Sequence, residues 1–255
     1  MSLERLQQAI RQRKTPVALA LGADASRLPQ ALVRQFVNLY GEGPMATAEA
    51  LRYHGCRVLA EAAGVLPAVY VDVSGYLRLG SVGLDVLLNL CSAARGHGYY
   101  VIADCRVSEA EAWFAILPDA DAVTVTPYAG GECCRVPEGK VVLALVRTKG
   151  ALSGEVQNLM AGDRRLYIAA AEQMARRGAG AVIETGYSLD IRELRRRQEK
   201  LFLVLTDCAA EDGECAFDDY GHGALVVDDT IQWADDVAGA AKAAVKAMKQ
   251  YVTVL

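Results

Sequence analysis

The chain has 255 residues, of which 53% are hydrophobic and 23% charged, a composition that suits a globular protein and excludes collagen-like, disordered and disulfide-scaffold classes. Its formal net charge of -4 gives no general electrostatic reason to bind nucleic acid or an anionic membrane surface. We therefore expect no nucleic-acid partner and no membrane partner.

The chain begins with the charged amphipathic run MSLERLQQAIRQRK, which predicts a helix over 1–14 and lacks the apolar core of a signal peptide. No later stretch has the uninterrupted apolar length of a transmembrane helix. These features predict a cytoplasmic protein. The 7 cysteines form no CxxC pair and have no histidine at ligand spacing, so we expect reduced thiols and no metal site built from them.

Eight short apolar segments, bounded by Gly, Pro or Asp, alternate with helical patterns and show hardly any hairpin signal. Each is continuously apolar, as expected when helices cover one face of a parallel sheet and a packed interior fills the other. The predicted strands span residues 16–22, 68–74, 99–105, 122–128, 141–147, 180–186, 201–207 and 224–229.

Helical patterns occupy 82–95, 164–177 and 190–198, and a C-terminal helix is predicted over 234–251. Eight β/α alternations favour an α/β fold with one (β/α)₈ TIM barrel over 1–255. An open doubly wound sheet is disfavoured, because the first predicted strand is followed by GADASRLP, which contains no GxGxxG.

The chemistry of such a barrel belongs to the C-terminal ends of its strands. Polar residues follow all eight predicted strands, and although any one of them could simply cap a helix, the density of acids favours a functional site. They are Asp24, Asp72, Ser74, Asp104, Arg106, Glu109, Thr126, Tyr128, Arg147, Lys149, Glu184, Thr185, Asp207, Asp228 and Asp229.

Three stretches resemble the orotidine 5′-monophosphate decarboxylase family, in particular its longer bacterial subgroup. YVIADCRVSEAEAW stands where the family has a strand followed by Asp-x-Lys-x-x-Asp, and DADAVTVTPYAGGE is similar to the family's ADAVTVNPYLG. LALVRTKGALSGEVQNL is similar to a strand that ends in Arg-Thr-Ser-Asn with a glutamine further on. Weaker similarities are LGAD near Asp24 and the spacing of Gly80 and Gly83.

The resemblance implies a TIM barrel that decarboxylates its nucleotide without cofactor or metal, using two lysines and two aspartates. Carried over, the strand-two lysine falls on or near Asp72, and Asp104 matches the first aspartate of the motif. Arg106 replaces the motif lysine, which in the family protonates the carbon left by carbon dioxide. Glu109 replaces the second aspartate, which in the family reaches a second subunit, so a homodimer is expected.

The same resemblance implies a set of ligand-binding positions at the strand ends. They are Asp24, Thr126, Pro127, Tyr128, Arg147, Thr148, Lys149, Gln157 and Asp229. Two departures from the family stand out here. Its glycine-rich phosphate loop has become the acidic LTDCAAEDGECAFDD, and its phosphate-binding arginine falls on Asp229.

We expect Asp72, Asp104 and Glu109 to meet at one mouth of the barrel with Arg106. A guanidinium is a poor proton donor, so the sequence favours a barrel protein without decarboxylase activity that serves in binding, regulation or assembly. Two alternatives stay open. One is an altered lyase in which Asp72 and Asp104 bind Mg²⁺, and the other is an active decarboxylase of pyrimidine biosynthesis in which Lys149 serves.

Overall fold

The computed structural model of the chain describes residues 2–184 and 186–255. Met1 of the predicted first helix and Thr185 of the predicted strand 180–186 therefore lie outside the described residues. Eight parallel strands close into a barrel in the order β1-β10-β9-β8-β5-β4-β3-β2, which confirms the predicted (β/α)₈ TIM barrel. The barrel strands are β1 (Val17–Leu21), β2 (Ala68–Asp72), β3 (Tyr100–Val107), β4 (Ala122–Val125), β5 (Val141–Arg147), β8 (Gly180–Glu184), β9 (Leu203–Thr206) and β10 (Ala224–Asp228).

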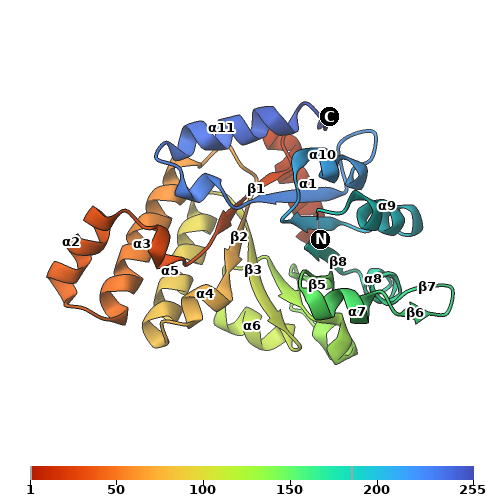
Figure 1. The fold of residues 1–255 in the computed structure, drawn as a ribbon, viewed down its shortest axis with the longest axis horizontal. Coiled ribbons are helices and arrows are strands. Elements are labelled where there is room, and N and C mark those ends of the chain that lie inside the picture. The colour runs from red at the N-terminus through yellow and green to blue at the C-terminus, as the bar shows by residue number, and fades with distance from the viewer. Residues whose placement is uncertain (1, 185) are drawn as a thin grey trace.

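Helices surround the barrel on its outer side (Figure 1). The α-helices are α1 (Ser2–Arg13), α2 (Gln30–Tyr40), α3 (Pro44–Glu61), α4 (Val73–Leu77), α5 (Ser81–Gly96), α6 (Ala110–Ile116), α7 (Ala151–Gln157), α8 (Leu166–Ala175), α9 (Ser188–Arg197), α10 (Ala210–Gly213) and α11 (Val237–Met248). Short 3₁₀ turns are η1 (Ala25–Arg27), η2 (Pro127–Ala129), η3 (Gly131–Cys134), η4 (Glu214–Ala216) and η5 (Ile231–Trp233).

Two additions to the barrel were not predicted. Between β1 and β2 the chain forms two helices, α2 and α3, and α2 lies outside the ring of helices at the left edge of Figure 1. Between α7 and α8 it forms a small antiparallel hairpin of β6 (Met160–Ala161) and β7 (Arg164–Arg165). The hairpin has only two residues in each strand, which is too short for a period-two pattern to reveal it.

The apolar core is divided by the barrel wall into an outer and an inner part. Alternate strand residues face opposite sides of a sheet, so one set packs under the helices and the other fills the barrel. The inner part contains Tyr100, Ile102, Leu143, Val182 and Val204, together with Leu6 and Ile10 of α1. The first helix therefore belongs to the core of the barrel.

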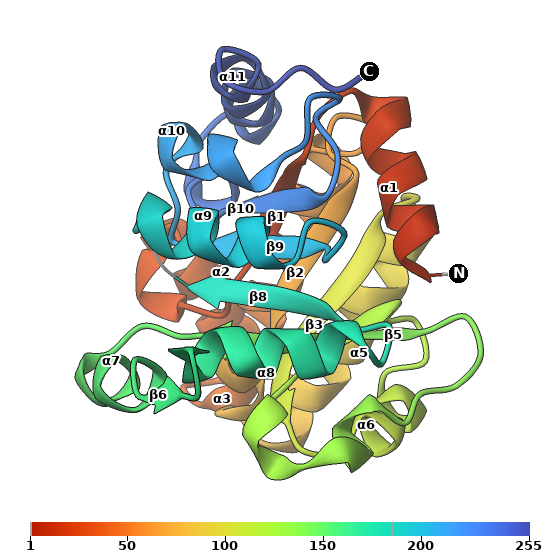
Figure 2. The ribbon, with the colours of Figure 1, turned by 90° about the vertical axis from the view of Figure 1, so that its right-hand side faces the viewer.

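Helix α1 lies across one end of the barrel, and α7 with the β6–β7 hairpin lies at the opposite end (Figure 2). The hydroxyl of Ser2 lies 2.6 Å from the hydroxyl of Tyr100 and donates to the backbone oxygen of Asp121 at 3.2 Å. Because α1 covers the N-terminal ends of the strands, only the C-terminal ends can form an open mouth.

Helices α4 and α5 approach so closely that one position admits only glycine. A Cβ atom on Gly83 would lie 1.9 Å from the backbone oxygen of Tyr76, a distance that no side chain tolerates. Gly80, with φ of 71°, precedes α5 in a conformation that favours glycine. These two glycines thus let α5 pack closely against α4, the helix that follows β2 directly at the barrel mouth.

Across the described ranges, every helix is too short or too polar to serve as a transmembrane span.

The first prediction concerns the helix that closes the barrel. Replacing the fully buried Leu6 with alanine leaves a cavity at the barrel end, and we expect it to lower the free energy of unfolding by about 2–5 kcal/mol in urea denaturation. The exposed Gln8 of the same helix gives a control, since Gln8→Ala should change stability by no more than about 0.5 kcal/mol. Equal effects of the two substitutions would contradict the closing role of α1.

Candidate functional site

The strand pattern places polar side chains inside the C-terminal mouth of the barrel. Four inner-core residues, Ile102, Ala122, Val182 and Val204, are each followed two positions later by a polar residue of the same strand. Residues two apart on a strand face the same side. The polar residues are Asp104 on β3, Thr124 on β4, Glu184 on β8 and Thr206 on β9.

An irregularity at the end of β3 positions Arg106. The register with β4 shifts between Ala103 and Val107, and Arg106 adopts φ of 55°, a left-handed conformation that is rare for a residue with a side chain. Its backbone N–H donates to the hydroxyl of Thr124 at 2.9 Å, which fixes the irregular turn. Residues held in such conformations cluster at functional sites.

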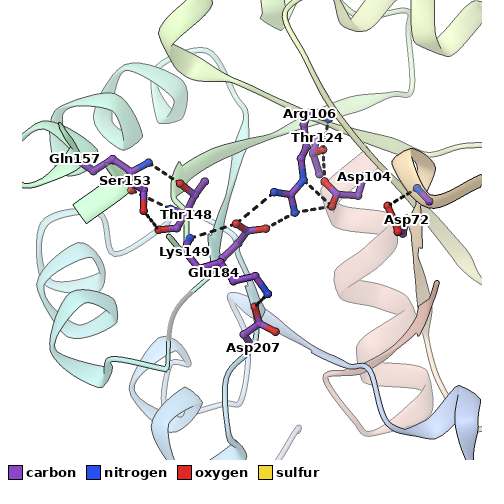
Figure 3. A network of polar contacts seen from close by, with 11 residues as sticks. Asp72, Asp104, Arg106, Thr124, Thr148, Lys149, Ser153, Gln157, Glu184 and Asp207 are labelled. Atoms are coloured by element: carbon purple, nitrogen blue, oxygen red, sulfur yellow. Dashed lines mark hydrogen bonds and ion pairs between the residues drawn. The ribbon is translucent and has the colours of Figure 1, made fainter. Parts of the chain in front are cut away.

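The guanidinium of Arg106 joins two carboxylates that come from different strands (Figure 3). Its Nε and Nη2 donate to Oδ2 of Asp104 at 3.1 and 2.9 Å, and Nη2 and Nη1 donate to the two oxygens of Glu184. The other oxygen of Asp104 accepts from the Thr124 hydroxyl at 2.7 Å. Asp104 and Glu184 are only 5% and 3% exposed, so one guanidinium is shared by two buried carboxylates and offsets part of their charge.

Burial alone would lower the pKa of Arg106, but the charges of Asp104 and Glu184 outweigh it, so that the pKa of the guanidinium is raised above its ordinary value. Arg106 therefore stays charged at every pH at which the protein is folded, and it holds its protons more tightly than a free arginine.

Two hydroxyl groups at the same mouth lack a hydrogen-bond partner within the described part of the chain: those of Tyr70 on β2 and Thr206 on β9. Tyr70 is 7% exposed. Burial raises the pKa of its phenol well above the ordinary value, and the nearby charge of Asp104 raises it further. A buried polar group without a partner is costly, so these two oxygens mark a place where a ligand or water is needed.

A second ion pair crosses the mouth between the end of β5 and the end of β9. The amine of Lys149 pairs with the carboxylate of Asp207, and this hydrogen bond raises the pKa of Lys149. Asp207 has φ of 52°, a second left-handed residue at the mouth. Both groups are considerably exposed, so the pair contributes little to stability.

A cavity of about 270 Å³ opens between these groups. Its polar lining consists of Tyr70, Asp72, Arg106, Lys149, Glu184, Thr206, Asp207, Asp229 and Gln232. A neighbouring cavity of about 690 Å³ shares Lys149, Glu184 and Asp207 with it. The inner cavity is at the small end of the range typical of small-molecule sites.

A third cavity, of about 300 Å³, lies between the ends of β9 and β10 and helix α11. Three carboxylates line it, those of Asp207, Asp228 and Asp229, and none of its lining residues is a lysine or arginine. Asp228 caps the following turn by accepting from the backbone N–H of Thr230 at 2.8 Å. The charged side chains that line this cavity are thus all carboxylates, of which Asp207 is paired with Lys149 from outside the lining.

The expected meeting of Asp72, Asp104 and Glu109 at one mouth with Arg106 is wrong for Glu109, while Asp104 pairs with Arg106 and Asp72 lies beside Asp104 on the neighbouring strand. Asp72 lines the inner cavity, but its carboxylate accepts from the backbone N–H of Gly75 at 3.1 Å and so caps α4 (Figure 3). Glu109 is exposed and lines a separate surface pocket with Glu111 and Arg135. Glu109 stands directly before α6, and Glu184 of β8 is the second carboxylate that pairs with Arg106.

The predicted ligand-binding residues that follow β1 and β4 do not line the inner cavity, although Ala20, Leu21 and Gly22 at the end of β1 do. Asp24 caps a 3₁₀ turn by accepting from the backbone N–H of Ser26 at 3.0 Å. The pKa of Asp24 is lowered mainly by the hydrogen bond from the Ser26 hydroxyl and further by this backbone N–H. Thr126 and Pro127 begin the turn after β4, and the hydroxyl of Tyr128 donates to Val146 at 3.2 Å. Burial raises the pKa of Tyr128 to about 12.

Arg147, Thr148 and Gln157 form an internal network that holds the loop between β5 and α7. The register of β5 with β8 shifts before Arg147, so Arg147 pairs with Ile183, a residue of the outer core. The Nε of Arg147 donates to the carboxylate of Asp190 on α9 at 2.9 Å. Gln157 accepts from the backbone N–H of Thr148 and donates to its hydroxyl, both at 2.9 Å. Arg147 and Thr148 also line the cavity of about 690 Å³.

Four residues at the mouth were not selected from the sequence as site residues: Tyr70, Thr124, Glu184 and Thr206. Glu184 was visible as a polar residue at a strand end. The other three could have been found from the alternation of side chains along a strand. Counting back in steps of two from the end of each strand separates the inward-facing residues from the outward-facing ones.

The architecture and the site together define a class of protein, a (β/α)₈ barrel with a charged cavity at the C-terminal ends of its strands. No protein-family model matches the chain. Two curated relatives are each named orotidine 5′-phosphate decarboxylase. The relative from Thermomicrobium roseum is 25% identical over 228 residues, which cover 83% of this chain and 76% of the relative. The relative from Rhodopirellula baltica is 25% identical over 209 residues, which cover 67% and 68% of the two chains.

Solved structures share the fold at lower identity. The OMP decarboxylase of Leishmania donovani superposes with a TM-score of 0.79 at 21% identity and covers 98% of both chains. The orotidine 5′-monophosphate decarboxylase of Plasmodium berghei has a TM-score of 0.82 at 12% identity and covers 97% of both chains. Together these similarities support membership of the orotidine 5′-phosphate decarboxylase family.

The second prediction tests the bridge of Arg106. Arg106→Met keeps the length of the side chain but leaves Asp104 and Glu184 without their cation. We expect a loss of about 2–4 kcal/mol in the free energy of unfolding near neutral pH, somewhat reduced by the partial exposure of the guanidinium. The loss should shrink in acid, because a proton shared by the two carboxyl groups can replace the missing charge.

A matched control for this variant is Arg78→Met, because Arg78 is exposed at the end of α4. Its effect in the same urea denaturation should stay within about 0.5 kcal/mol. An Arg106→Met protein as stable as the control, or one whose loss does not depend on pH, would contradict the bridge.

Proposed function

We propose that this family member binds a small ligand at the mouth of its barrel and does not decarboxylate orotidine 5′-monophosphate. One observation carries the proposal: the position that holds the lysine in the Asp-x-Lys-x-x-Asp motif is Arg106, and its guanidinium is fixed between Asp104 and Glu184. Three of its four carboxylate contacts are 3.1 Å or shorter, so it is not available as a mobile proton donor.

Every other cationic or phenolic group at the mouth also holds its proton tightly. A general acid works best when its pKa lies near the operating pH. The hydrogen bond with Asp207 raises the pKa of Lys149, and burial raises the pKa of Tyr70. Neither inward-facing residue at the end of β2, Tyr70 or Asp72, is a lysine. Among the described residues, neither the amine of Lys149 nor the phenol of Tyr70 is therefore tuned to protonate a carbanion.

The acidic cavity beside β9 and β10 supports the proposal that orotidine 5′-monophosphate is not a substrate. A phosphate group needs backbone N–H groups, lysines or arginines around it. Asp207, Asp228 and Asp229 would instead repel a phosphate dianion. This arrangement argues against a nucleotide monophosphate as the ligand.

The two alternatives have less support. For the lyase with Mg²⁺, the carboxylates of Asp72 and Asp104 face different partners, Gly75 and Arg106. Among residues 2–184 and 186–255, no group of three His, Cys, Asp or Glu side chains is arranged to hold a metal ion. For the active decarboxylase, Lys149 is the available amine, and it is engaged by Asp207.

The third prediction is that purified protein leaves orotidine 5′-monophosphate unchanged. The assay follows loss of orotate absorbance over hours at high protein concentration, with the Thermomicrobium roseum relative as the positive control. We expect no turnover because the motif lysine is absent. Turnover in the usual enzymatic range of about 1–1000 per second would refute the proposal.

The fourth prediction concerns the phosphate. Uridine 5′-monophosphate at about 1 mM should leave the melting temperature unchanged, because ligand stabilisation follows RT ln(1 + [L]/Kd) and the carboxylates weaken binding. Differential scanning fluorimetry is sufficient for the measurement. A rise of several degrees would mean that other residues rebuild a phosphate site.

The homodimer expected from the family stays part of this proposal. Glu109 is exposed directly before α6, on the loop that in the family contacts a second subunit. A symmetric pair of such loops would bring two copies together around a twofold axis. Sedimentation equilibrium should give the mass of a dimer, and Glu109→Lys should shift it towards the monomer. A protein that stays monomeric at all concentrations would contradict the expected homodimer.

A further inference from the structure

We propose that the inner cavity of about 270 Å³ binds a small amino polyol, a compact molecule with one ammonium group and several hydroxyl groups. The proposal names the ligand class of the site described above and so rests on the proposed function. Two independent features carry it: carboxylates that lack a cation, and hydroxyls that lack a hydrogen-bond partner.

The charges around the cavity are unevenly neutralised. On one side, Arg106 is shared by Asp104 and Glu184, and Lys149 is paired with Asp207. These cations are already satisfied and offer little to an anionic ligand.

On the opposite side the carboxylates of Asp72 and Asp229 line the same cavity from the ends of β2 and β10. Asp72 accepts only the N–H of Gly75, and neither carboxylate has an ion-pair partner among the residues that the structure describes. An unneutralised carboxylate pair at the rim of a small cavity favours a positively charged ligand group. A metal ion fits less well, since a third carboxylate, histidine or thiol does not converge with them in the described chain.

The floor of the cavity provides the second feature. The hydroxyls of Tyr70 and Thr206 are buried, line the cavity and make no hydrogen bond of normal geometry within the described chain, although the Tyr70 phenol lies close to the Asp104 carboxylate. A hydroxyl can both donate and accept a hydrogen bond. Hydroxyl groups of a ligand can therefore satisfy both, whereas an apolar ligand would leave them unpaired at a cost.

The wall between the two sides is preorganised. The side-chain oxygen of Gln232 accepts from the backbone N–H of Gly22 at 2.9 Å, and its backbone oxygen lies 2.9 Å from Nε2 of the buried His54. The ring of His54 stacks on Trp233 at 5.2 Å between centroids. A polar side chain fixed in this way can orient a ligand without a further loss of entropy.

The experiment uses three sugars that differ mainly in charge: D-glucosamine, D-glucose and D-glucose 6-phosphate. Calorimetric titrations of the intact protein are run at constant ionic strength and at a pH at which the amine of glucosamine is protonated. We expect glucosamine to bind about tenfold more tightly than glucose. Glucose 6-phosphate should bind least.

Two variants separate the two features. Asp229→Asn should weaken glucosamine binding about threefold to fivefold and leave glucose binding unchanged. Its matched control is Asp235→Asn, which makes the same change of charge at an exposed site outside the cavity lining and should alter neither. Tyr70→Phe should weaken both sugars about fivefold while the melting temperature of the free protein stays the same or rises.

Several results would overturn the inference: no binding of glucosamine, equal binding of glucosamine and glucose, or preferred binding of glucose 6-phosphate. A Tyr70→Phe protein that loses stability but keeps its affinity for both sugars would show that the phenol interacts with Asp104 and does not bind a ligand. These failures are distinct from failure of the proposed function, which the decarboxylation assay decides on the same preparation.

Discussion

The bridge from Arg106 to Asp104 and Glu184 is the interaction on which the mouth of this barrel depends. Two carboxylates that are almost fully buried repel each other inside a barrel unless a cation or a shared proton lies between them. The guanidinium reaches both because β3 ends irregularly and Arg106 takes a left-handed backbone conformation. Thr124 completes the arrangement by bonding both the Asp104 carboxylate and the Arg106 backbone.

The interior of the barrel is apolar at its N-terminal end and polar at its C-terminal end. At the N-terminal end, Leu6 and Ile10 of α1 continue the apolar interior, so water is excluded there. At the C-terminal end the inward positions become acidic or hydroxylated, and the cavity opens between them. A closed end and a polar open end let the barrel keep a continuous core while presenting charged groups to a ligand.

The bridge also links stability to chemistry. The charges that stabilise Arg106 raise its pKa, and the pairing with Asp207 raises that of Lys149. A mouth organised for firm ion pairing is therefore poorly suited to release a proton at neutral pH. The fold is shared with solved decarboxylase structures and the relatives carry that name, whereas the charge arrangement is the basis on which we propose binding.

The sequence by itself determined the eight strands and the closed (β/α)₈ barrel, because continuous apolar segments alternate with helical patterns. It also showed that acids gather at the strand ends, and the resemblance to the family implied that Arg106 and Asp229 stand at positions of basic residues. Tertiary structure decided which of these acids meet. Glu184 joins Asp104 across two intervening strands, while Asp72 caps α4 and Glu109 faces outward. A local pattern cannot encode such choices, since they depend on the register between strands and on two irregular strand ends.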